Sequence, residues 1–430
     1  MHRRILRLAI PNILSNLSVP LLGMVDTALM GRQADPAYLG AVALGTMLFN
    51  FLYWGMGFLR MGTTGLTAQA YGQGEAKAQF RLLLQALLVA LGAGFLFLAL
   101  QMPIERLAFW LVPGEAKVIA LAQRYYYLRI WAAPATIGLY ALNGWFLGMQ
   151  NARVPMLLTI AGNAANIALN FYFVQQRGLA IEGVALGTVI AQYLTLVLAL
   201  LAWYQQHRDL LAHLPDVQVL DPASLRRFFT VNRDIFLRTL ALIFAFSFFT
   251  AQSSGLDPLV LAANQILLQY LHLMAFGVDG FAFAAESLVG RFVGAKDEGG
   301  LRQVIRLLFR WGLGLGAAFS LAYLLAGGPL LRLFTDQTEV LQVARRYVGW
   351  MVLLPLSGAY AYLWDGIYFG ATATRPMRNA MLLVTGLVFL PLALAAPWVG
   401  NHLLWLALTL FMLARGIALH ALAGRHIYGR

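Results

Sequence analysis

The sequence contains no cysteine and few charged residues. Without cysteine the chain has no disulfide bonds and no thiolate metal sites, so redox chemistry gives no information about its compartment. Only 11% of the 430 residues are Asp, Glu, Lys or Arg, and 60% are hydrophobic. A soluble globular chain carries about 25% charged residues. This shortage of charge indicates a chain whose surface faces mainly lipid.

Motifs of several enzyme classes are also missing. The sequence has no GxxxxGK[ST] phosphate loop, which argues against ATP hydrolysis by the chain, and no HExxH motif. The histidines are scattered, and no Ser-His-Asp arrangement stands out. We therefore expect no catalytic residue, no metal site and no cofactor, and we predict a protein that is not an enzyme.

Long apolar runs are abundant. A bilayer core about 30 Å thick is crossed by about 20 apolar residues in a helix. The period-2 alternation of a membrane barrel is absent, so helices remain as the way to satisfy the backbone in lipid. The sequence thus predicts an all-α membrane protein with twelve transmembrane helices. The predicted spans are 8–30, 38–70, 82–102, 126–148, 155–174, 183–204, 235–254, 259–290, 303–326, 347–371, 379–398 and 402–423.

An internal repeat divides the chain into two halves. The longest polar interval, 205–233, separates the spans six and six. RYYYLRIWAAP, ending at Pro134, matches RRYVGWMVLLP, ending at Pro355, and GWFLG from Gly144 matches GIYFG from Gly366. A six-helix repeat keeps its orientation in the membrane, which predicts two six-helix lobes related by a parallel repeat. The predicted domains are an amino-terminal lobe (1–204), a cytoplasmic connector (205–233) and a carboxy-terminal lobe (234–430).

The net charge of +13 is compatible with nucleic-acid binding, but the positions of the charges argue against it. Lys and Arg cluster between the apolar runs, on the sides that alternate as cytoplasmic, which is the positive-inside bias. The start MHRRILRLAI leads into a long apolar run, typical of an uncleaved first membrane helix. We expect a multi-pass protein of the bacterial cytoplasmic (inner) membrane, with both termini cytoplasmic, the lipid bilayer as a partner and no nucleic acid.

The first span contains an acidic residue and two prolines. A charge at the bilayer centre costs about 2.5–3.5 kcal/mol on insertion scales, so Asp26 calls for an explanation. It is either a structural residue satisfied by neighbouring hydroxyls and amides, or a proton or cation site, and we favour the second interpretation. Pro11 and Pro20 lie on the same helix, where each removes a backbone hydrogen bond and favours bending.

The fifth span carries three asparagines on one helical face. Asn163, Asn166 and Asn170 in GNAANIALN are spaced i, i+3 and i+7. Amides on one face can simply bond across helices, or they can line a polar pocket that faces Asp26. We favour the pocket, to which Thr188 of the sixth span adds a hydroxyl.

The second half carries a different set of acids. Together with Asn163 of the fifth span, the candidate secondary polar sites are Asp279, Glu286 and Asp365. The alternative for Asp279 and Asp365 is that the acid is paired with an interior cation or with helix ends at a bend. The possible cationic partners, which the sequence does not assign, are Arg60, Arg129, Arg238 and Arg415.

Several motifs resemble the multidrug and toxic compound extrusion (MATE) family, DinF-like branch. They are VPLLGMVDTALMG, GNAANIALN, VNRDIFLRTL, VDGFAFAAES and DGIYFGATATRPMRNAM. The resemblance implies export of hydrophobic, often cationic compounds, driven by inward flow of protons or sodium, through a cavity between two lobes. It places cation coupling on Asp26 and helix bending on Pro11. Asn166 matches the family pattern, whereas Asn170 stands where an Asp is frequent.

We therefore predict a monomeric, proton-coupled antiporter of small drug-like compounds that works by alternating access. The predicted cation-coupling residues are Asp26, Asn166, Asn170 and Thr188. Sodium coupling and flipping of a lipid-linked precursor are the alternatives. A membrane-embedded transferase is disfavoured because no outer loop is long enough for a catalytic site.

Overall fold

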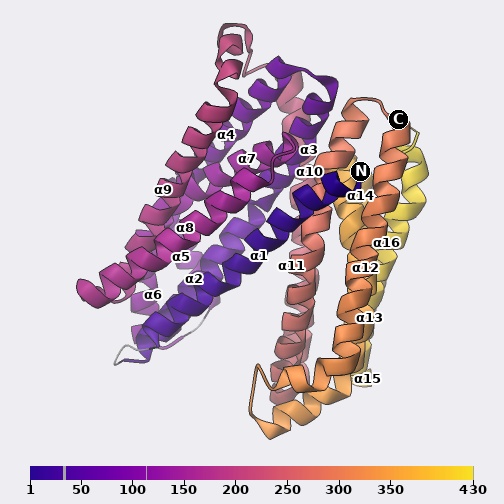
Figure 1. The fold of residues 1–430 in the computed structure, drawn as a ribbon. Helices are drawn as coiled ribbons and strands as arrows, with labels where there is room; N and C mark the ends of the chain where they lie inside the picture. Colours follow the sequence, from indigo (N-terminus) through magenta and orange to yellow (C-terminus); the bar gives the residue numbers. More distant parts are fainter. Residues whose placement is uncertain (32–34, 113, 430) are drawn as a thin grey trace. The chain divides into compact units, whose positions relative to one another are not determined.

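The chain is helical in a computed structural model that describes residues 1–31, 35–112 and 114–429 (Figure 1). Over these residues it forms two compact units. The amino-terminal unit is Leu14–Arg226, and the carboxy-terminal unit combines Met1–Ile13 with Arg227–Arg430. The predicted lobe boundaries at 204 and 234 remain a prediction.

The amino-terminal unit is built mainly from pairs of packed helices, in which α7 packs against α3 and α4, α8 against α9, and α2 against α6. Its elements are α1 (His2–Met30, which begins in the other unit), α2 (Ala37–Gly55), α3 (Gly57–Gln73), α4 (Ala76–Ala99), α5 (Gln101–Leu111), α6 (Ala116–Arg129), η1 (Ile130–Ala132), α7 (Ala133–Gly148), α8 (Arg153–Phe171), η2 (Tyr172–Gln176), α9 (Ile181–His207) and η3 (Arg208–Asp216).

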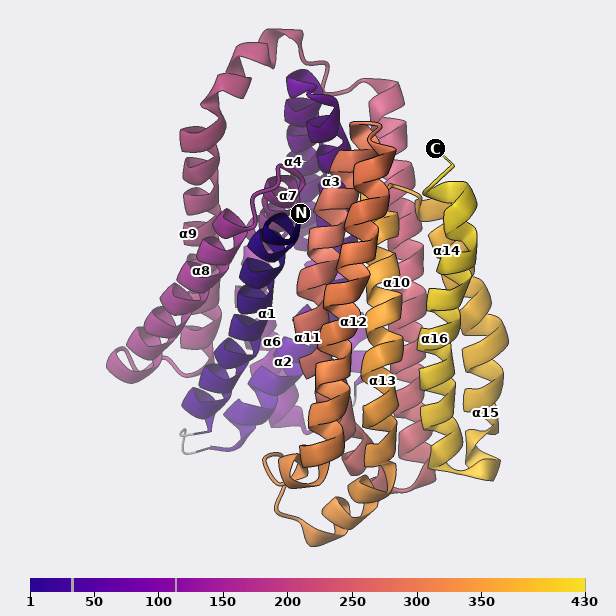
Figure 2. The same ribbon diagram turned by 45° about the vertical axis from the view of Figure 1, so that its right-hand side comes forward.

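The carboxy-terminal unit is organised around α13, which packs against α11, α12 and α16; these helices run side by side in Figures 1 and 2. Its elements are α10 (Pro222–Leu256), α11 (Pro258–Gly294), α12 (Glu298–Leu331), α13 (Thr338–Gly370), α14 (Thr374–Val384), η4 (Thr385–Phe389), α15 (Leu390–Val399) and α16 (Asn401–His426).

Each of the twelve predicted spans falls on a helical segment. Ten stretches within the described residues are long and apolar enough to cross a membrane. The other two predicted spans lie on α6 to α7 and on α13. The short helix α5 was not predicted as a separate element, and most of it lies between the predicted spans 82–102 and 126–148.

The predicted connector is largely helical. Residues 205–233 comprise the end of α9, the 3-10 helix η3 and the first turns of α10. The connector is attached to α4, where Lys77 Nζ lies 2.8 Å from Asp216 Oδ2 and Gln85 Nε2 donates to Val219 O at 2.9 Å. Its cytoplasmic location remains a prediction.

The repeat is reproduced in a close helix contact of each unit. A Cβ atom on Gly144 of α7 would lie 2.5 Å from Arg60 O of α3. A Cβ atom on Gly366 of α13 would lie 2.3 Å from Ala282 O of α11. The two contacts are equivalent in the repeat, so only glycine lets the backbones approach this closely in either unit.

The same relation holds one turn further along each helix. A Cβ atom on Gly148 would lie 2.9 Å from Thr64 O, and one on Gly370 would lie 2.5 Å from Glu286 O. Each half therefore has a glycine pair at the spacing of the small-xxx-small pattern that brings membrane helices together.

A buried amide network joins three helices of the carboxy-terminal unit. Asn264 of α11 donates to Ser253 Oγ of α10 at 2.8 Å and to Asn401 Oδ1 of α16 at 2.7 Å. Asn401 donates back to Asn264 Oδ1 at 2.9 Å, and Trp405 Nε1 donates to the same oxygen at 2.8 Å. Since both amides make these bonds away from water, the network fixes α10, α11 and α16 to one another.

Substitutions at the repeated glycines test this packing. Gly144→Ala and Gly366→Ala should each lower the free energy of unfolding by about 1–3 kcal/mol, because the new methyl group meets a backbone carbonyl. Gly92→Ala is the matched control: its Cβ meets nothing within 4 Å. It should be neutral or stabilise by about 0.5–1 kcal/mol. Thermal unfolding of the purified protein in detergent measures both effects, and equal midpoints for the three variants would contradict the proposed close approach.

Candidate functional site

The asparagine face of α8 contacts two neighbouring helices of the amino-terminal unit. Asn163 Nδ2 donates to Ser18 of α1, at 3.0 Å to Oγ and 3.3 Å to the backbone oxygen. Asn166 is buried and donates through Nδ2 to Thr188 Oγ1 of α9 at 3.1 Å. The i, i+3, i+7 spacing therefore presents amides to α1 and α9 from a single helix.

Asp26 is the end point of a chain of hydrogen bonds. Asn170 Nδ2 donates to Asp26 Oδ1 at 2.7 Å and to Asn166 Oδ1 at 2.8 Å. From Asn166 the chain continues to Thr188, whose Oγ1 donates to Val184 O at 2.8 Å. A change at the carboxylate of Asp26 can therefore alter hydrogen bonds on three helices, α1, α8 and α9.

Asn170 is closely packed against α9. Its side chain is fully buried, and a Cβ atom on Gly187 of α9 would lie 2.0 Å from its Oδ1. That oxygen has no hydrogen-bond partner among the described residues. Asn170 thus donates to the acid and offers a spare buried acceptor beside it. Directly after α8, the chain forms the π-helical turn η2, a feature frequent at functional sites.

The two prolines of the first span lie within one continuous helix. α1 is helical from His2 to Met30, so it includes both Pro11 and Pro20. Pro11 belongs to the carboxy-terminal unit and Pro20 to the amino-terminal unit. Their role in bending the helix remains a prediction.

In the carboxy-terminal unit, Asp365 is an ion-pair partner of two arginines. Arg238 Nη2 of α10 contacts Asp365 Oδ2, and Arg415 Nη2 of α16 lies 3.4 Å from the same oxygen. All three side chains are buried. Asp365 therefore has the interior cationic partners that the sequence left unassigned.

Asp279 and Glu286 lie on α11 of the same unit. Asp279 is half-buried and interacts electrostatically with Arg415 and with Tyr362 of α13. Glu286 is buried, with 1% of its surface exposed. Their role as secondary polar sites remains a prediction.

Two charged groups were not given a role by the sequence. Arg129 of α6 was named only as a possible partner for the acids of the second half. It lies instead in the amino-terminal unit, where it interacts electrostatically with Asp26. The sequence feature that could have pointed to a role for Arg129 is its position as a cation within a predicted membrane span.

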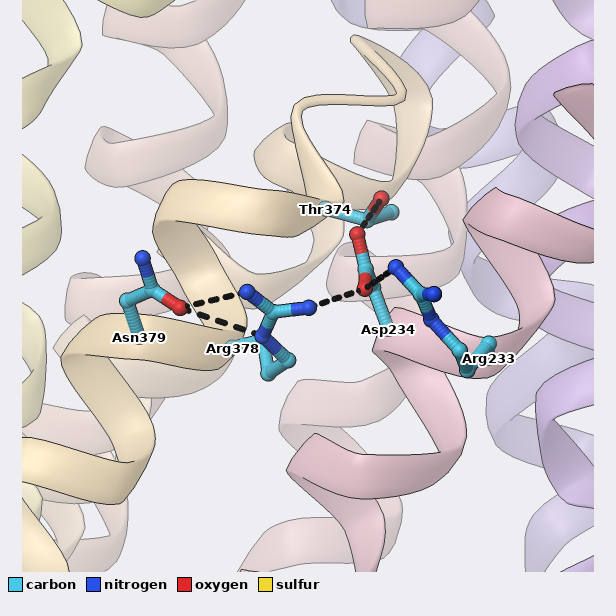
Figure 3. A network of polar contacts seen from close by, with 5 residues as sticks. All are labelled: Arg233, Asp234, Thr374, Arg378 and Asn379. Carbon is cyan, nitrogen blue, oxygen red and sulfur yellow. Dashed lines mark hydrogen bonds and ion pairs between the residues drawn. The ribbon is translucent and has the colours of Figure 1, made fainter.

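The second group surrounds Asp234 of α10, which is buried (Figure 3). Arg378 Nη1 lies 2.6 Å from Asp234 Oδ1, and Arg233 Nη2 lies 3.3 Å from the same oxygen. Thr374 Oγ1 donates to Oδ2 at 3.3 Å, and Arg378 also donates to Asn379 Oδ1. These residues occur in two of the quoted motifs, VNRDIFLRTL and DGIYFGATATRPMRNAM, and they join α10 to α14.

No cluster of three or more His, Asp or Glu side chains suited to a metal ion occurs within residues 1–31, 35–112 and 114–429. The polar groups described in this subsection are the hydrogen-bond chain at Asp26, the Asp365 cluster and the Asp234 cluster.

Comparisons with known proteins agree with the repeat and the fold. A family model described as MatE matches the chain twice, at residues 11–172 and 235–394. DNA damage-inducible protein F of Escherichia coli (strain K12) is 42% identical over 97% of this chain and 91% of its own length. A probable multidrug resistance protein NorM of Bradyrhizobium diazoefficiens is 29% identical over 84% of this chain and 78% of its own length.

A solved structure described as MATE in the bent conformation has a TM-score of 0.88 at 16% identity, covering 100% of this chain and 96% of that one. Such structures have twelve helices in two lobes, so the likeness confirms the predicted all-α fold of two six-helix lobes. The resemblance to the MATE family is confirmed as well.

The ion pairs of Asp365 give a test of stability. Asp365→Asn should lower the free energy of unfolding by about 3–5 kcal/mol, because two buried guanidinium groups lose their counter-ion. The exposed pair of Lys77 and Asp216 provides the control, and Lys77→Ala should leave stability unchanged within error. Denaturant unfolding of the purified protein measures the difference. If Asp365→Asn lowers the free energy of unfolding no more than Lys77→Ala does, the stability of the buried cluster does not depend on Asp365.

Proposed function

The chain belongs to the MatE family, and from this premise we propose that it is a secondary active multidrug exporter. Members of the family are transporters, so the chain is not classed as an enzyme. It is a multi-pass membrane protein. The proposed location is the bacterial inner membrane with both termini in the cytoplasm, and the proposed substrates are hydrophobic or cationic drug-like compounds, by analogy with the NorM relative.

The proposed coupling ion is the proton, and the hydrogen-bond chain at Asp26 carries this proposal. Asp26 is the one acid in the chain of hydrogen bonds from Asn170 to Val184. Protonation removes the charge of the carboxylate and turns an oxygen that only accepts hydrogen bonds into one that can donate. The bond from Asn170 Nδ2 to Asp26 then weakens, and the amides of Asn170 and Asn166 are free to reorient.

Alternating access requires that the coupling ion stabilise one conformation more than the other. In the proposal, proton binding from the outside changes how α1 is bonded to α8, and the prolines of α1 let that helix adjust. Substrate is then released outward, and loss of the proton to the cytoplasm restores the bond between Asn170 and Asp26.

One observation favours sodium as the second candidate ion. Asn170 Oδ1 is buried, has no hydrogen-bond partner among the described residues and lies in the same side chain that bonds Asp26. A carboxylate and an amide oxygen are both hard oxygen donors of the kind that alkali and alkaline-earth cations prefer. The two ions are therefore separated by imposing one gradient at a time.

The test uses proteoliposomes and the lipophilic cation ethidium. An acidic lumen should drive ethidium uptake by the unmodified protein, whereas a sodium-loaded lumen at equal pH should not. Asp26→Asn should reduce uptake to that of protein-free vesicles, because the amide cannot exchange a proton. Asp216→Asn, which changes an exposed carboxyl of η3, should leave uptake unchanged. Full proton-driven uptake by Asp26→Asn would refute the role of Asp26, and uptake driven by sodium alone would replace the proton by sodium.

A further inference from the structure

The ion pairs around Asp234 leave an excess of positive charge where α10 meets α14. In the cluster of Figure 3, Arg233 and Arg378 both bond to the carboxylate of Asp234, which is buried. Arg375 is exposed on α14, next to Thr374, which donates to the same carboxylate. The three arginines and the one carboxylate together carry a net charge of +2. The cluster can therefore stabilise a further anion.

Arg233 and Arg375 are the arginines that can reach such an anion. Arg233 bonds to Asp234 through Nη2 alone and is 63% exposed, and a guanidinium has five N–H donors. Arg375 lies in the first turn of α14, and among the described residues of this helix none in that turn is acidic. Because the start of a helix carries partial positive charge, a cation there is unfavourable unless an anion offsets it.

α10 and α14 with η4 are parallel neighbours. Near the start of α14, Thr374 and Arg378 bond to Asp234 of α10. Further along both helices, the ring of Phe248 packs edge-on against that of Phe389 in η4, with centroids 6.3 Å apart. Since the second contact lies later in both segments, the two helices run in the same direction. Residues that follow Arg233 and Arg375 therefore extend side by side away from the charged end.

Each of these helices has a stripe of exposed residues that includes one of the two arginines. On α10 the exposed residues of the stripe are Phe229, Arg233, Leu240 and Phe244. On α14 and η4 they are Arg375, Asn379, Leu382, Leu383 and Leu387.

Both stripes lie on the same face of the helix pair. On α10 the stripe is roughly a quarter turn before the contact residue Asp234, and on α14 it is roughly a quarter turn after the contact residue Arg378. For parallel helices, such opposite offsets point to the same side.

The distance between charge and apolar side chains on this face fits a phospholipid. Leu240 follows Arg233, and Leu382 follows Arg375, by two helical turns or about 10 Å. Phe244 lies about 16 Å beyond Arg233. Half of a bilayer core is about 15 Å thick. The face therefore has cations at one end and apolar side chains over the depth of one layer of acyl chains.

We propose that this face of α10 and α14 binds an anionic phospholipid, with its phosphate at Arg233 and Arg375 and its acyl chains along the two stripes. Basic sites between membrane helices suit anionic headgroups. The excess of arginine favours an anionic lipid over a zwitterionic one, whose headgroup would bring a cation toward the guanidinium groups. The bound phosphate is a second anion beside Asp234, so it also strengthens the joint between α10 and α14. This site is separate from the transport mechanism proposed above.

The experiment titrates the purified protein in detergent with phosphatidylglycerol and with phosphatidylcholine of the same acyl chains. Native mass spectrometry measures the bound lipid. The unmodified protein should bind phosphatidylglycerol more tightly. The double variant Arg233→Gln, Arg375→Gln should weaken this binding by about 30-fold, because each arginine near the membrane surface contributes about fivefold. Its binding of phosphatidylcholine should not change.

Three further variants keep the test specific. Arg233→Lys with Arg375→Lys keeps both charges and should retain most of the affinity. Arg153→Gln removes an exposed arginine from the first turn of α8, the counterpart of α14 in the repeat, and should leave the affinity unchanged. Arg375→Gln alone leaves the ion pairs of Asp234 intact and should weaken binding about fivefold, so it replaces the double variant if that does not fold.

Three results would overturn the proposal. The first is an unchanged affinity for phosphatidylglycerol after loss of the arginines. The second is an equal loss of affinity in Arg153→Gln, which would show attraction to positive charge anywhere on the protein. The third is full displacement of the lipid by glycerol 3-phosphate, which has the phosphate without acyl chains and would identify a site for free phosphate. Retention of the lipid in excess glycerol 3-phosphate is the expected result.

Discussion

A polar group buried among apolar helices must find its partner inside the protein, and this requirement shapes both units. Amides meet the requirement by pairing, as Asn264 and Asn401 do where α10, α11 and α16 join. Charges meet it through ion pairs, as Asp365 does with two arginines. At Asp26 a carboxylate accepts from an amide, that of Asn170, instead of from a guanidinium. Amide bonds of the kind that hold helices together elsewhere are there linked to a group that can change charge.

Helix positions were predictable from the sequence because lipid imposes a simple rule on apolar length. The structure differs from the prediction at the start of α10. This helix begins at Pro222, although charged residues such as Arg226 and Arg233 had indicated a polar connector there. The α8 amides were predictable from their spacing. The partner of each charge was not, since pairing depends on which helices become neighbours. Arg129 lies in the same unit as Asp26, and Arg238 pairs with Asp365. The local sequence around each arginine does not indicate either arrangement.

The two halves share a frame and differ in chemistry. The close approach of Gly144 to Arg60 O has its counterpart in that of Gly366 to Ala282 O, so α3 with α7 repeats as α11 with α13. Such contacts tolerate little change, because a single methyl group would collide with backbone. Polar side chains away from these contacts are less constrained. The amino-terminal unit has an acid bonded to amides, whereas the carboxy-terminal unit has acids paired with arginines.

The division of α1 between the units has a consequence for synthesis of the chain. Residues 1–13 are made before residues 14–226, yet they belong to the unit whose remaining residues, 227–430, are made afterwards. Domains generally fold as units in the order of their synthesis. Here the first turns of α1 have no native neighbours of their own unit until the second half has been translated and inserted. The carboxy-terminal unit is therefore completed only when its later helices pack against residues 1–13, which were made about two hundred residues earlier. Only then is α1 packed along its whole length.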